Sequence, residues 1–141
     1  MPICDAELIQ WAVKAREKSY SPYSDFSVGA ALLAKNGKLY LGCNIENAAF
    51  TPGICAERTA FSKALSEGDK DFEAIAIVGG KEGGNLDHIC APCGVCRQFI
   101  REFTEPATFR ILLAPLNAPE KITSYTLEQL LPESFGPDNL K

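Results

Sequence analysis

The chain alternates strand-like and helix-like segments after residue 55, and this alternation constrains the fold more than any other feature of the sequence. Residues 72–80 (FEAIAIVGG) are a continuous apolar run, typical of a strand buried on both faces. Helical segments lie before it at about 55–65 and after it at 93–103, and residues 108–114 (TFRILLA) read as the next strand. Strands that alternate with helices predict a largely parallel portion of sheet with helices covering its faces.

The first third of the chain predicts one helix and one hairpin. Residues 5–19 place apolar side chains at helical spacing, and Asp5 is suited to be the N-cap residue. The apolar positions of this predicted helix are Leu8, Trp11, Ala12 and Ala15. Residues 27–47 read as two strands joined at Asn36-Gly37, a pair that suits a tight hairpin turn. Together with the later segments, the hairpin predicts an α/β sandwich.

Length and composition predict one globular domain, which we assign to residues 1–141. No stretch reads as a linker, a repeat or a low-complexity segment. In the tail, residues 126–131 (TLEQLL) are the one short helical candidate. The chain is long enough to bury a substantial core.

Charge and apolar patterning narrow the choice of partners. The net charge is −4 and the sequence pI is near 5.0, which disfavours a protein whose main role is to hold a nucleic-acid backbone. No apolar run approaches the ~20 residues that span a bilayer, and no N-terminal signal pattern is present. We therefore expect a cytoplasmic protein with a small-molecule partner and neither a nucleic-acid nor a membrane partner.

The six cysteines suggest a metal site. In a reducing compartment, clustered cysteines more often bind metal or do redox chemistry than form disulfides. Cys93 and Cys96 are three residues apart in the first turn of a predicted helix, so their sulfurs can meet one ion. Cys55 opens the preceding helix after a strand, and such junctions can meet at one edge of a sheet, where α/β folds tend to place ligands.

Three thiolates around Zn²⁺ leave the fourth tetrahedral position open, which is typical of catalytic rather than structural zinc. The partial positive charge of a helix N-terminus would offset their negative charge, and Arg58 could donate to one of the thiolates. Glu57 lies two residues from Cys55, where it cannot easily bind the same ion but can reach a bound water as a proton shuttle.

Other interpretations of these residues remain open. The C-x-x-C pair alone could be a redox pair or half of a structural zinc knuckle. Cys90 would close the site as a fourth ligand, although Pro92 favours an extended backbone just before it. The simplest interpretation of Cys4 and Cys43 is a core or subsurface thiol, and that of His88 is a loop residue.

The sequence resembles the cytidine deaminases. The resemblance rests on CAE at 55–57 and PCGVC at 92–96, which match the zinc signature in the all-cysteine form of small homotetrameric members. SPYSDFSVGAAL at 21–32, GCNIENAAF at 42–50 and CRQFIREF at 96–103 extend the match over most of residues 21–103. The resemblance implies a three-layer α/β/α sandwich with a mixed five-stranded sheet, and a homotetramer.

The resemblance also implies a mechanism, that of the zinc deaminases. Cys55, Cys93 and Cys96 would hold one Zn²⁺ per chain. Glu57 would take a proton from the metal-bound water, pass it to ring N3 and then protonate the leaving amine. The products would be uridine or 2′-deoxyuridine and ammonia, from cytidine or 2′-deoxycytidine, in pyrimidine salvage.

The remaining implied roles concern the substrate and its surroundings. Phe26 would pack on the pyrimidine face, and Asn44 and Glu46 would bind the ribose hydroxyls. The backbone N–H of Ala56 and the carbonyl of Ala91 would read the base edge. Two further aromatic positions are possible inter-subunit contacts: Phe50, where many relatives carry tyrosine with its hydroxyl, and Phe135, where the family places an aromatic that reaches a neighbouring subunit.

Three rival functions are weighed against this one. A deaminase acting on nucleic acid would need a basic groove, which the acidic balance disfavours. A deaminase of a cytosine-containing antibiotic shares the chemistry and differs only in substrate. A non-catalytic zinc module would fill the fourth position with Cys90 or His88, and Glu57 would then have no role. The sequence does not rank cytidine against deoxycytidine.

Overall fold

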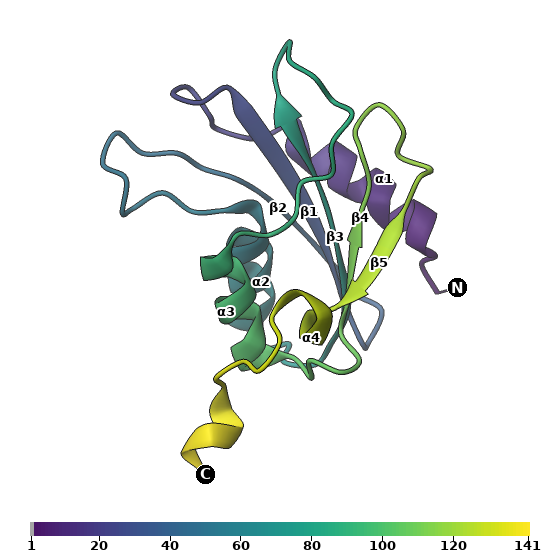
Figure 1. The fold of residues 1–141 in the computed structure, drawn as a ribbon, viewed down its shortest axis with the longest axis vertical. Coiled ribbons are helices and arrows are strands. Elements are labelled where there is room, and N and C mark those ends of the chain that lie inside the picture. Colours follow the sequence, from purple (N-terminus) through teal and green to yellow (C-terminus); the bar gives the residue numbers. More distant parts are fainter. Residues whose placement is uncertain (1) are drawn as a thin grey trace.

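A five-stranded mixed sheet forms the centre of the protein (Figure 1), whose computed structural model describes residues 2–141. The strands are β1 (Phe26–Ala34), β2 (Leu39–Cys43), β3 (Phe72–Lys81), β4 (Arg110–Leu113) and β5 (Thr123–Thr126), in the order β2-β1-β3-β4-β5. The helices are α1 (Asp5–Arg16), α2 (Ala56–Ser66), α3 (Gly94–Phe103) and α4 (Leu127–Leu130), and a short 3₁₀ helix, η1 (Pro137–Leu140), follows.

Among the five strands, only β3 and β4 pair in parallel, and these are the two strands that the sequence predicts after residue 55. The pairs β1–β2, β1–β3 and β4–β5 are antiparallel. Strand β5 has the sequence TSYT, which is short and polar, and its residues gave no strand signal of their own. Only the family resemblance implied a fifth strand.

Helices cover both faces of the sheet, which confirms the expected three-layer sandwich (Figure 1). Alternation along the strands builds the two apolar layers. In β1, Ala31 and Leu33 pack toward α1, whereas Ala30 and Leu32 pack toward α2 and α3. Strand β3 is buried on both faces, as its continuous apolar sequence predicts. Among residues 2–141, no helix is both long and apolar enough to cross a membrane.

Two details of the N-terminal helix differ from prediction. The N-cap residue is Cys4, and Asp5 lies in the first turn, where its carboxylate pairs with Arg110 at 3.0 Å. Trp11 is 40% exposed, and Ile9 is fully buried on the face that packs against the sheet. The helix also ends at Arg16, three residues before the predicted end.

The hairpin turns where the sequence predicts, but through a three-residue loop rather than the tight turn that Asn36-Gly37 suits. Ala34 N–H donates to Lys38 O at 2.9 Å, and Gly37 N–H donates to Ala34 O at 3.0 Å. Of the loop residues only Gly37 has a positive φ, +89°. The pattern is therefore a turn closed by one left-handed glycine, since the tight Asn-Gly turn needs positive φ at both residues.

Candidate active site

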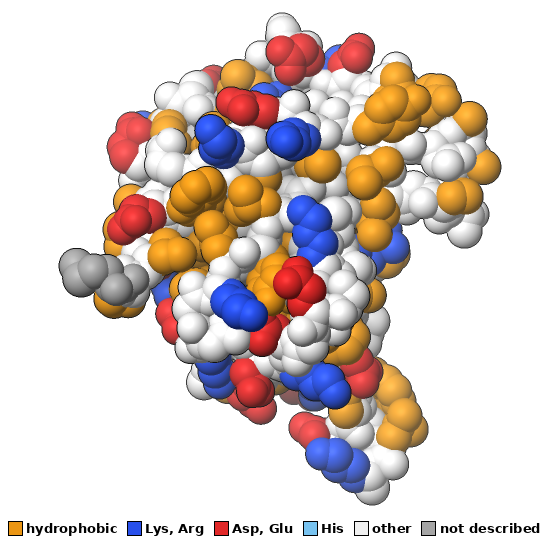
Figure 2. Space-filling model, turned by 180° about the vertical axis from the view of Figure 1, so that it is seen from behind, with side chains coloured by type: hydrophobic (Ala, Val, Ile, Leu, Met, Phe, Trp, Pro, Cys, Tyr) orange, Lys and Arg blue, Asp and Glu red, His pale blue; other side chains and the backbone are white. Residues whose placement is uncertain are grey.

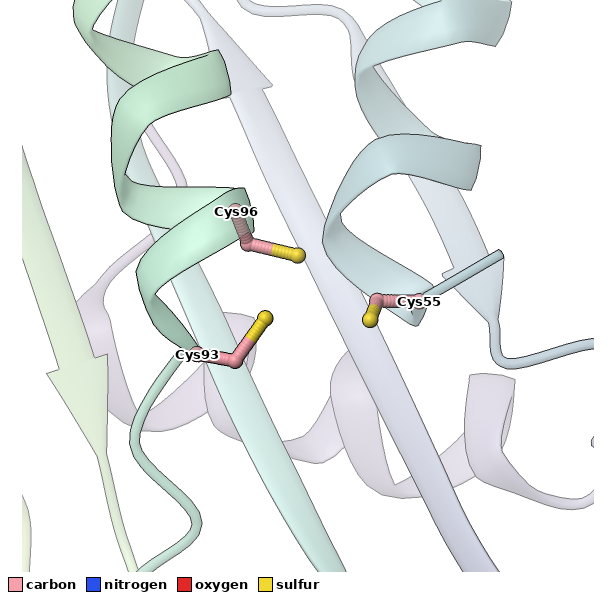
Figure 3. Close-up of side chains that lie close together, drawn as sticks. All are labelled: Cys55, Cys93 and Cys96. Carbon is pink, nitrogen blue, oxygen red and sulfur yellow. The ribbon is translucent and has the colours of Figure 1, made fainter. Parts of the chain in front are cut away.

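Three cysteine sulfurs meet between the N-termini of α2 and α3, on the side of the sheet opposite α1 (Figure 3). The Sγ atoms of Cys55, Cys93 and Cys96 all lie within 4.8 Å of one another. Cys96 is fully buried, Cys55 is half-buried and Cys93 is exposed. The cluster is thus open to solvent on one side, as a catalytic metal site requires.

The backbone explains why these sulfurs converge. Cys55 and Cys93 are the N-cap residues of α2 and α3, with extended backbones and no side-chain capping bond, so both thiols are free to face each other. Gly42 on β2 lets α2 sit close to the sheet, since a Cβ there would lie 2.4 Å from Ala56 O and 2.6 Å from Ala60 N. The close approach fixes the end of α2 that carries Cys55.

The electrostatics of the cluster favour a thiolate at Cys55. Hydrogen bonds from the Cys96 thiol and from Arg58 lower the pKa of Cys55 to about 5, with Arg58 Nη2 3.8 Å from the Cys55 sulfur. The same hydrogen bond raises the pKa of Cys96, because Cys96 holds the proton that the pair shares. Arg58 Nε is buried and has no hydrogen-bond partner among the described residues. This donor set, three sulfurs beside the partly buried guanidinium of Arg58, fits a zinc ion.

Glu57 is only 4% exposed and lies two residues after the N-cap residue of α2, Cys55. Burial is the main cause that raises the pKa of its carboxyl to about 7, and the charge of Cys55 adds to the effect. A carboxyl with a pKa near 7 can take and give protons at neutral pH.

A cavity of about 660 Å³ opens beside the cysteines and is large enough for a small molecule. Its lining includes most of the residues predicted from the sequence: Asn44, Glu46, Phe50, Cys55, Ala56, Glu57, Arg58, Ala91 and Cys93. Sequence reasoning did not single out Tyr23, Ser24, Val28, Ile45 or Ile54, which also line it. Phe26 and Phe135 are not among the lining residues.

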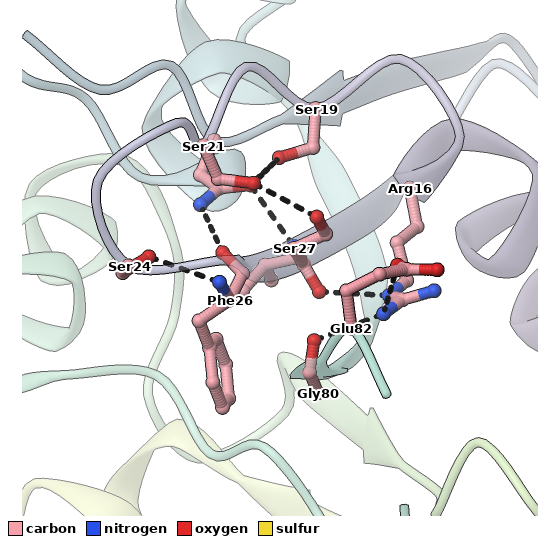
Figure 4. A network of polar contacts seen from close by, with 10 residues as sticks. Arg16, Ser19, Ser21, Ser24, Phe26, Ser27, Gly80 and Glu82 are labelled. Atoms are coloured by element: carbon pink, nitrogen blue, oxygen red, sulfur yellow. Dashed lines mark hydrogen bonds and ion pairs between the residues drawn. The ribbon is translucent and has the colours of Figure 1, made fainter. Parts of the chain in front are cut away.

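Asn44 is held by three hydrogen bonds at the start of β1. Its Oδ1 accepts from Val28 N–H at 2.9 Å and from Ser19 Oγ at 2.5 Å, and its Nδ2 donates to Phe26 O at 2.8 Å. Both lone pairs of the oxygen are used, so one N–H remains for a ligand. Ser19, Ser21 and Ser27 link their hydroxyls beside this contact (Figure 4).

Glu46 is bound to the loop before β1. Its carboxylate accepts from Tyr23 N–H at 3.0 Å, from Ser24 N–H at 3.2 Å and from the Ser24 hydroxyl, and the hydroxyl bond is the main cause that lowers the pKa of Glu46. Ser24 Oγ in turn accepts from Phe26 N–H at 3.0 Å. The role of Ser24 was missed because serines are common in loops, and others lie nearby in the sequence at positions 19, 21 and 27.

The three predicted aromatic positions are all exposed. Phe26 is 40% exposed and lies two residues from the cavity-lining Val28, hence on the same face of β1. Phe50 is 97% exposed in the segment between β2 and α2, which projects from the sheet (Figure 1). Figure 2, seen from behind, shows hydrophobic side chains over this projecting end. Phe135 is 58% exposed in the C-terminal tail.

The other cysteines and the histidine lie outside the cluster. Cys90 lines the cavity, and burial raises the pKa of its thiol to about 12, which makes it a poor metal ligand. Cys43 is half-buried and donates to Lys18 O at 3.3 Å. Cys4 is exposed, so the prediction of a core or subsurface thiol is wrong for it, and His88 is an exposed loop residue.

Comparison with known proteins agrees with this geometry. Residues 2–111 match the family model described as "Cytidine and deoxycytidylate deaminase zinc-binding region". The chain is 46% identical over 134 residues to a cytidine deaminase of Sporosarcina psychrophila, covering 95% of this chain and 93% of the relative. It is 44% identical over 133 residues to a cytidine deaminase of Halalkalibacterium halodurans, covering 94% and 95%.

Solved structures give the same result. The crystal structure of cytidine deaminase from Burkholderia pseudomallei matches with a TM-score of 0.84 and 41% identity, covering 94% of this chain and 99% of that one. That of cytidine deaminase from Mycobacterium tuberculosis matches with a TM-score of 0.75 and 33% identity, covering 92% and 94%.

Proposed function

The chain belongs to the cytidine and deoxycytidylate deaminase family, and on that premise we propose that it hydrolyses cytidine and 2′-deoxycytidine to uridine and 2′-deoxyuridine, releasing ammonia. The observation that carries this proposal is the meeting of three cysteine sulfurs with a buried glutamate at one wall of a cavity. A role in pyrimidine salvage follows from these substrates and products.

Cys55, Cys93 and Cys96 would hold one Zn²⁺ per chain. When bound, zinc supplies Lewis-acid chemistry that lowers the pKa of a water molecule to about 7. Arg58 offsets the charge of the thiolates through its bond to the Cys55 sulfur. The helix N-termini at Cys55 and Cys93 act in the same direction.

Glu57 moves the protons of the reaction. Its carboxylate takes a proton from the water that attacks C4 of the pyrimidine and delivers it to ring N3. It then carries a second proton to the exocyclic amine, which leaves as ammonia while the C4 carbonyl forms. A buried carboxyl with a pKa of about 7 can exchange protons in both directions at neutral pH.

The other cavity residues would orient the nucleoside. The Ala56 N–H has no intrahelical acceptor because it lies in the first turn of α2, so it can donate to the base. The Ala91 carbonyl would accept from the amine. Asn44, with one N–H to offer, and Glu46 would bind the ribose hydroxyls, and Phe26 would pack on the base.

We further propose a single domain over residues 1–141 that assembles as a homotetramer in the cytoplasm. The exposed aromatic side chains near the cavity support assembly, because they would be covered by other subunits. Phe50 and Phe135 are the residues that we expect at these contacts. The six free cysteines support a reducing compartment.

The test is to follow the ultraviolet absorbance of cytidine and of deoxycytidine with purified protein and to measure zinc in the same sample. We expect turnover with about one zinc per chain. Zinc without turnover on either nucleoside would contradict the proposed substrates. Turnover only on a cytosine-containing antibiotic would favour that rival activity instead.

A further inference from the structure

The segment that leads into Cys93 has almost no hydrogen bonds of its own. Among the described residues, no backbone-to-backbone hydrogen bond involves residues 88–92, although this segment carries Ala91 and precedes a predicted zinc ligand. A single hydrogen bond reaches it: the Nε of Arg97 donates to the carbonyl of Pro92 at 2.7 Å. Apart from the packing of Cys90 and Pro92, Arg97 therefore provides the one hydrogen bond that fixes this stretch of backbone among the described residues.

Arg97 is itself well anchored. Its Nη1 donates to Leu130 O at 2.7 Å, at the end of α4, and its backbone N–H donates to Cys93 O at 2.9 Å in the first turn of α3. The planar guanidinium thus spans the two carbonyls of Pro92 and Leu130 as a rigid fork. Pro92 is buried, so its carbonyl has little access to water as an alternative donor.

One bond to Pro92 O can orient two functional groups because of proline geometry. The Pro92 carbonyl and the Cys93 N–H share a peptide plane, so fixing the oxygen fixes the direction from which Cys93 projects. The proline ring holds φ of Pro92 near −65°, so only ψ of Pro92 separates this plane from the preceding peptide plane, which carries the Ala91 carbonyl.

We propose that Arg97 is a positioning residue that sets the backbone of Ala91–Cys93, and through it both the Cys93 thiolate and the Ala91 carbonyl. The proposal rests on the proposed function for the roles of those two groups. Arg97 does not line the cavity, and its side chain reaches residues 88–93 only at the Pro92 carbonyl.

Arg101 provides a matched control. It lies one turn later on the same helix, and its Nε donates to Ser134 Oγ at 2.9 Å while its Nη2 lies 3.8 Å from Asp138. Like Arg97 it ties α3 to the C-terminal segment, but it makes no hydrogen bond to residues 88–93. A purely structural role for Arg97 would give the two arginines similar effects.

The experiment compares Arg97→Gln, Arg97→Lys and Arg101→Gln with the wild-type protein. Zinc release to a chromogenic chelator is measured for each zinc-loaded protein, together with kcat, KM for cytidine and Tm. We expect release from Arg97→Gln to be about 10–100-fold faster than from wild type, the usual cost of losing a partner that orients a ligand. Release from Arg101→Gln should stay within about 3-fold. Arg97→Lys should restore part of the difference, since an ammonium can still donate to Pro92 O.

Equal release from Arg97→Gln and Arg101→Gln would overturn the proposal. If Arg97→Gln does not fold, Arg97→Lys carries the comparison, and release equal to that of Arg101→Gln would again overturn it. If the wild type neither binds zinc nor turns over cytidine, the proposed function fails separately. In that case the positioning role is tested by backbone ¹⁵N relaxation of residues 90, 91 and 93. Order parameters below about 0.6 are expected only in the Arg97 variants. Unchanged values would contradict the positioning role.

Discussion

The pKa of Glu57, the proposed acid–base residue, depends on burial more than on charged neighbours. Glu57 lies two residues after the N-cap of α2, where the helix dipole favours a carboxylate, yet the pKa of its carboxyl rises to about 7 because its side chain is buried. A carboxyl at the surface of the same helix would stay ionised at neutral pH and would deliver protons poorly.

Glu57→Gln removes the titratable group and keeps the shape of the side chain. We expect zinc content to remain at the wild-type value and kcat to fall by at least about 10²–10⁴-fold, the usual contribution of a general acid–base group. Both are measured on one sample, by metal analysis and by the cytidine absorbance assay. A kcat within tenfold of wild type would contradict the assigned role.

Cys93 and Cys90 allow the ligand set to be tested with the same substitution at two nearby thiols. Cys93→Ala should lose zinc and lower Tm, because metal binding contributes to the free energy of folding. Cys90→Ala should keep zinc, since Cys90 lies outside the sulfur cluster and its thiol has a pKa of about 12. Metal analysis after dialysis distinguishes the two. Zinc retained in Cys93→Ala, or lost from Cys90→Ala, would refute the three-cysteine set.

At the scale of elements, two glycines let helices approach the sheet from opposite faces. A Cβ at Gly42 would lie 2.4 Å from Ala56 O in α2, and one at Gly29 would lie 2.0 Å from Ala12 O in α1. Both contacts are with backbone, which cannot rotate away. Only the first bears on the site, because Ala56 lies between Cys55 and Glu57.

Comparing Gly42→Ala with Gly29→Ala should therefore distinguish a loss of stability from a change in the geometry of the site. Each should lower the free energy of unfolding by about 1–3 kcal/mol through overpacking. Only Gly42→Ala should also speed zinc release and lower kcat, because it displaces the start of α2. Denaturant titration gives the stabilities, and chelator competition gives the release rates. Equal release rates in the two variants would show that the approach of α2 does not fix the ligand geometry.

The hairpin is tied to the end of α2 by a tyrosine. Tyr40 donates its hydroxyl to Asp69, and this hydrogen bond is the main cause that raises the pKa of Tyr40 to about 12. The neutral phenol makes the bond, so its contribution to stability is complete below pH 10 and is lost as the pH rises toward 12.

Tyr40→Phe should lower Tm at pH 8, and the difference from wild type should shrink between pH 10 and 12. Tyr125→Phe is the control, because the Tyr125 hydroxyl makes no hydrogen bond among the described residues. Tm is followed by circular dichroism across this pH range. A difference between wild type and Tyr40→Phe that did not change with pH would contradict the bond to Asp69.

The helices and long strands could be predicted from the sequence because each carries a strong local pattern. Strand β5 could not, since TSYT is polar and pairs only through contacts with β4. The exposure of Trp11 was missed because helical spacing does not say how wide the buried stripe is.

Some residues of the site could likewise be predicted from the sequence, and others could not. The spacing of Cys93 and Cys96 made the approach of their sulfurs predictable, and the order of elements predicted that Cys55 joins them. The contacts of Ser24 with Glu46, and of Arg97 with Pro92, join residues that are distant or unremarkable in sequence. No periodicity reports such contacts, so only the folded chain shows them.

At the scale of the whole molecule, the cavity wall is unusually exposed. Tyr23 is 62% exposed, Ile45 is 43% exposed and Phe50 is 97% exposed, although all three line the cavity. Large apolar side chains in such positions leave water only when another surface covers them. A subunit packed on this end would complete the cavity as well as bury the side chains.

Phe50→Ser should therefore weaken assembly and binding together. We expect wild type to sediment with a mass near four times the 15.3 kDa of the chain, and Phe50→Ser to dissociate at higher protein concentration. KM for cytidine should rise with the dissociated fraction, because the isolated chain leaves the cavity wall open. Trp11→Gln, on the α1 face and 40% exposed, is the control and should keep the wild-type mass.

Since Phe50 could touch substrate directly, the decisive comparison is KM at a concentration where Phe50→Ser is fully assembled. If KM returns to the wild-type value at that concentration, the rise in KM is caused by dissociation. If Phe50→Ser keeps the wild-type mass at every concentration, Phe50 does not lie in the subunit contact.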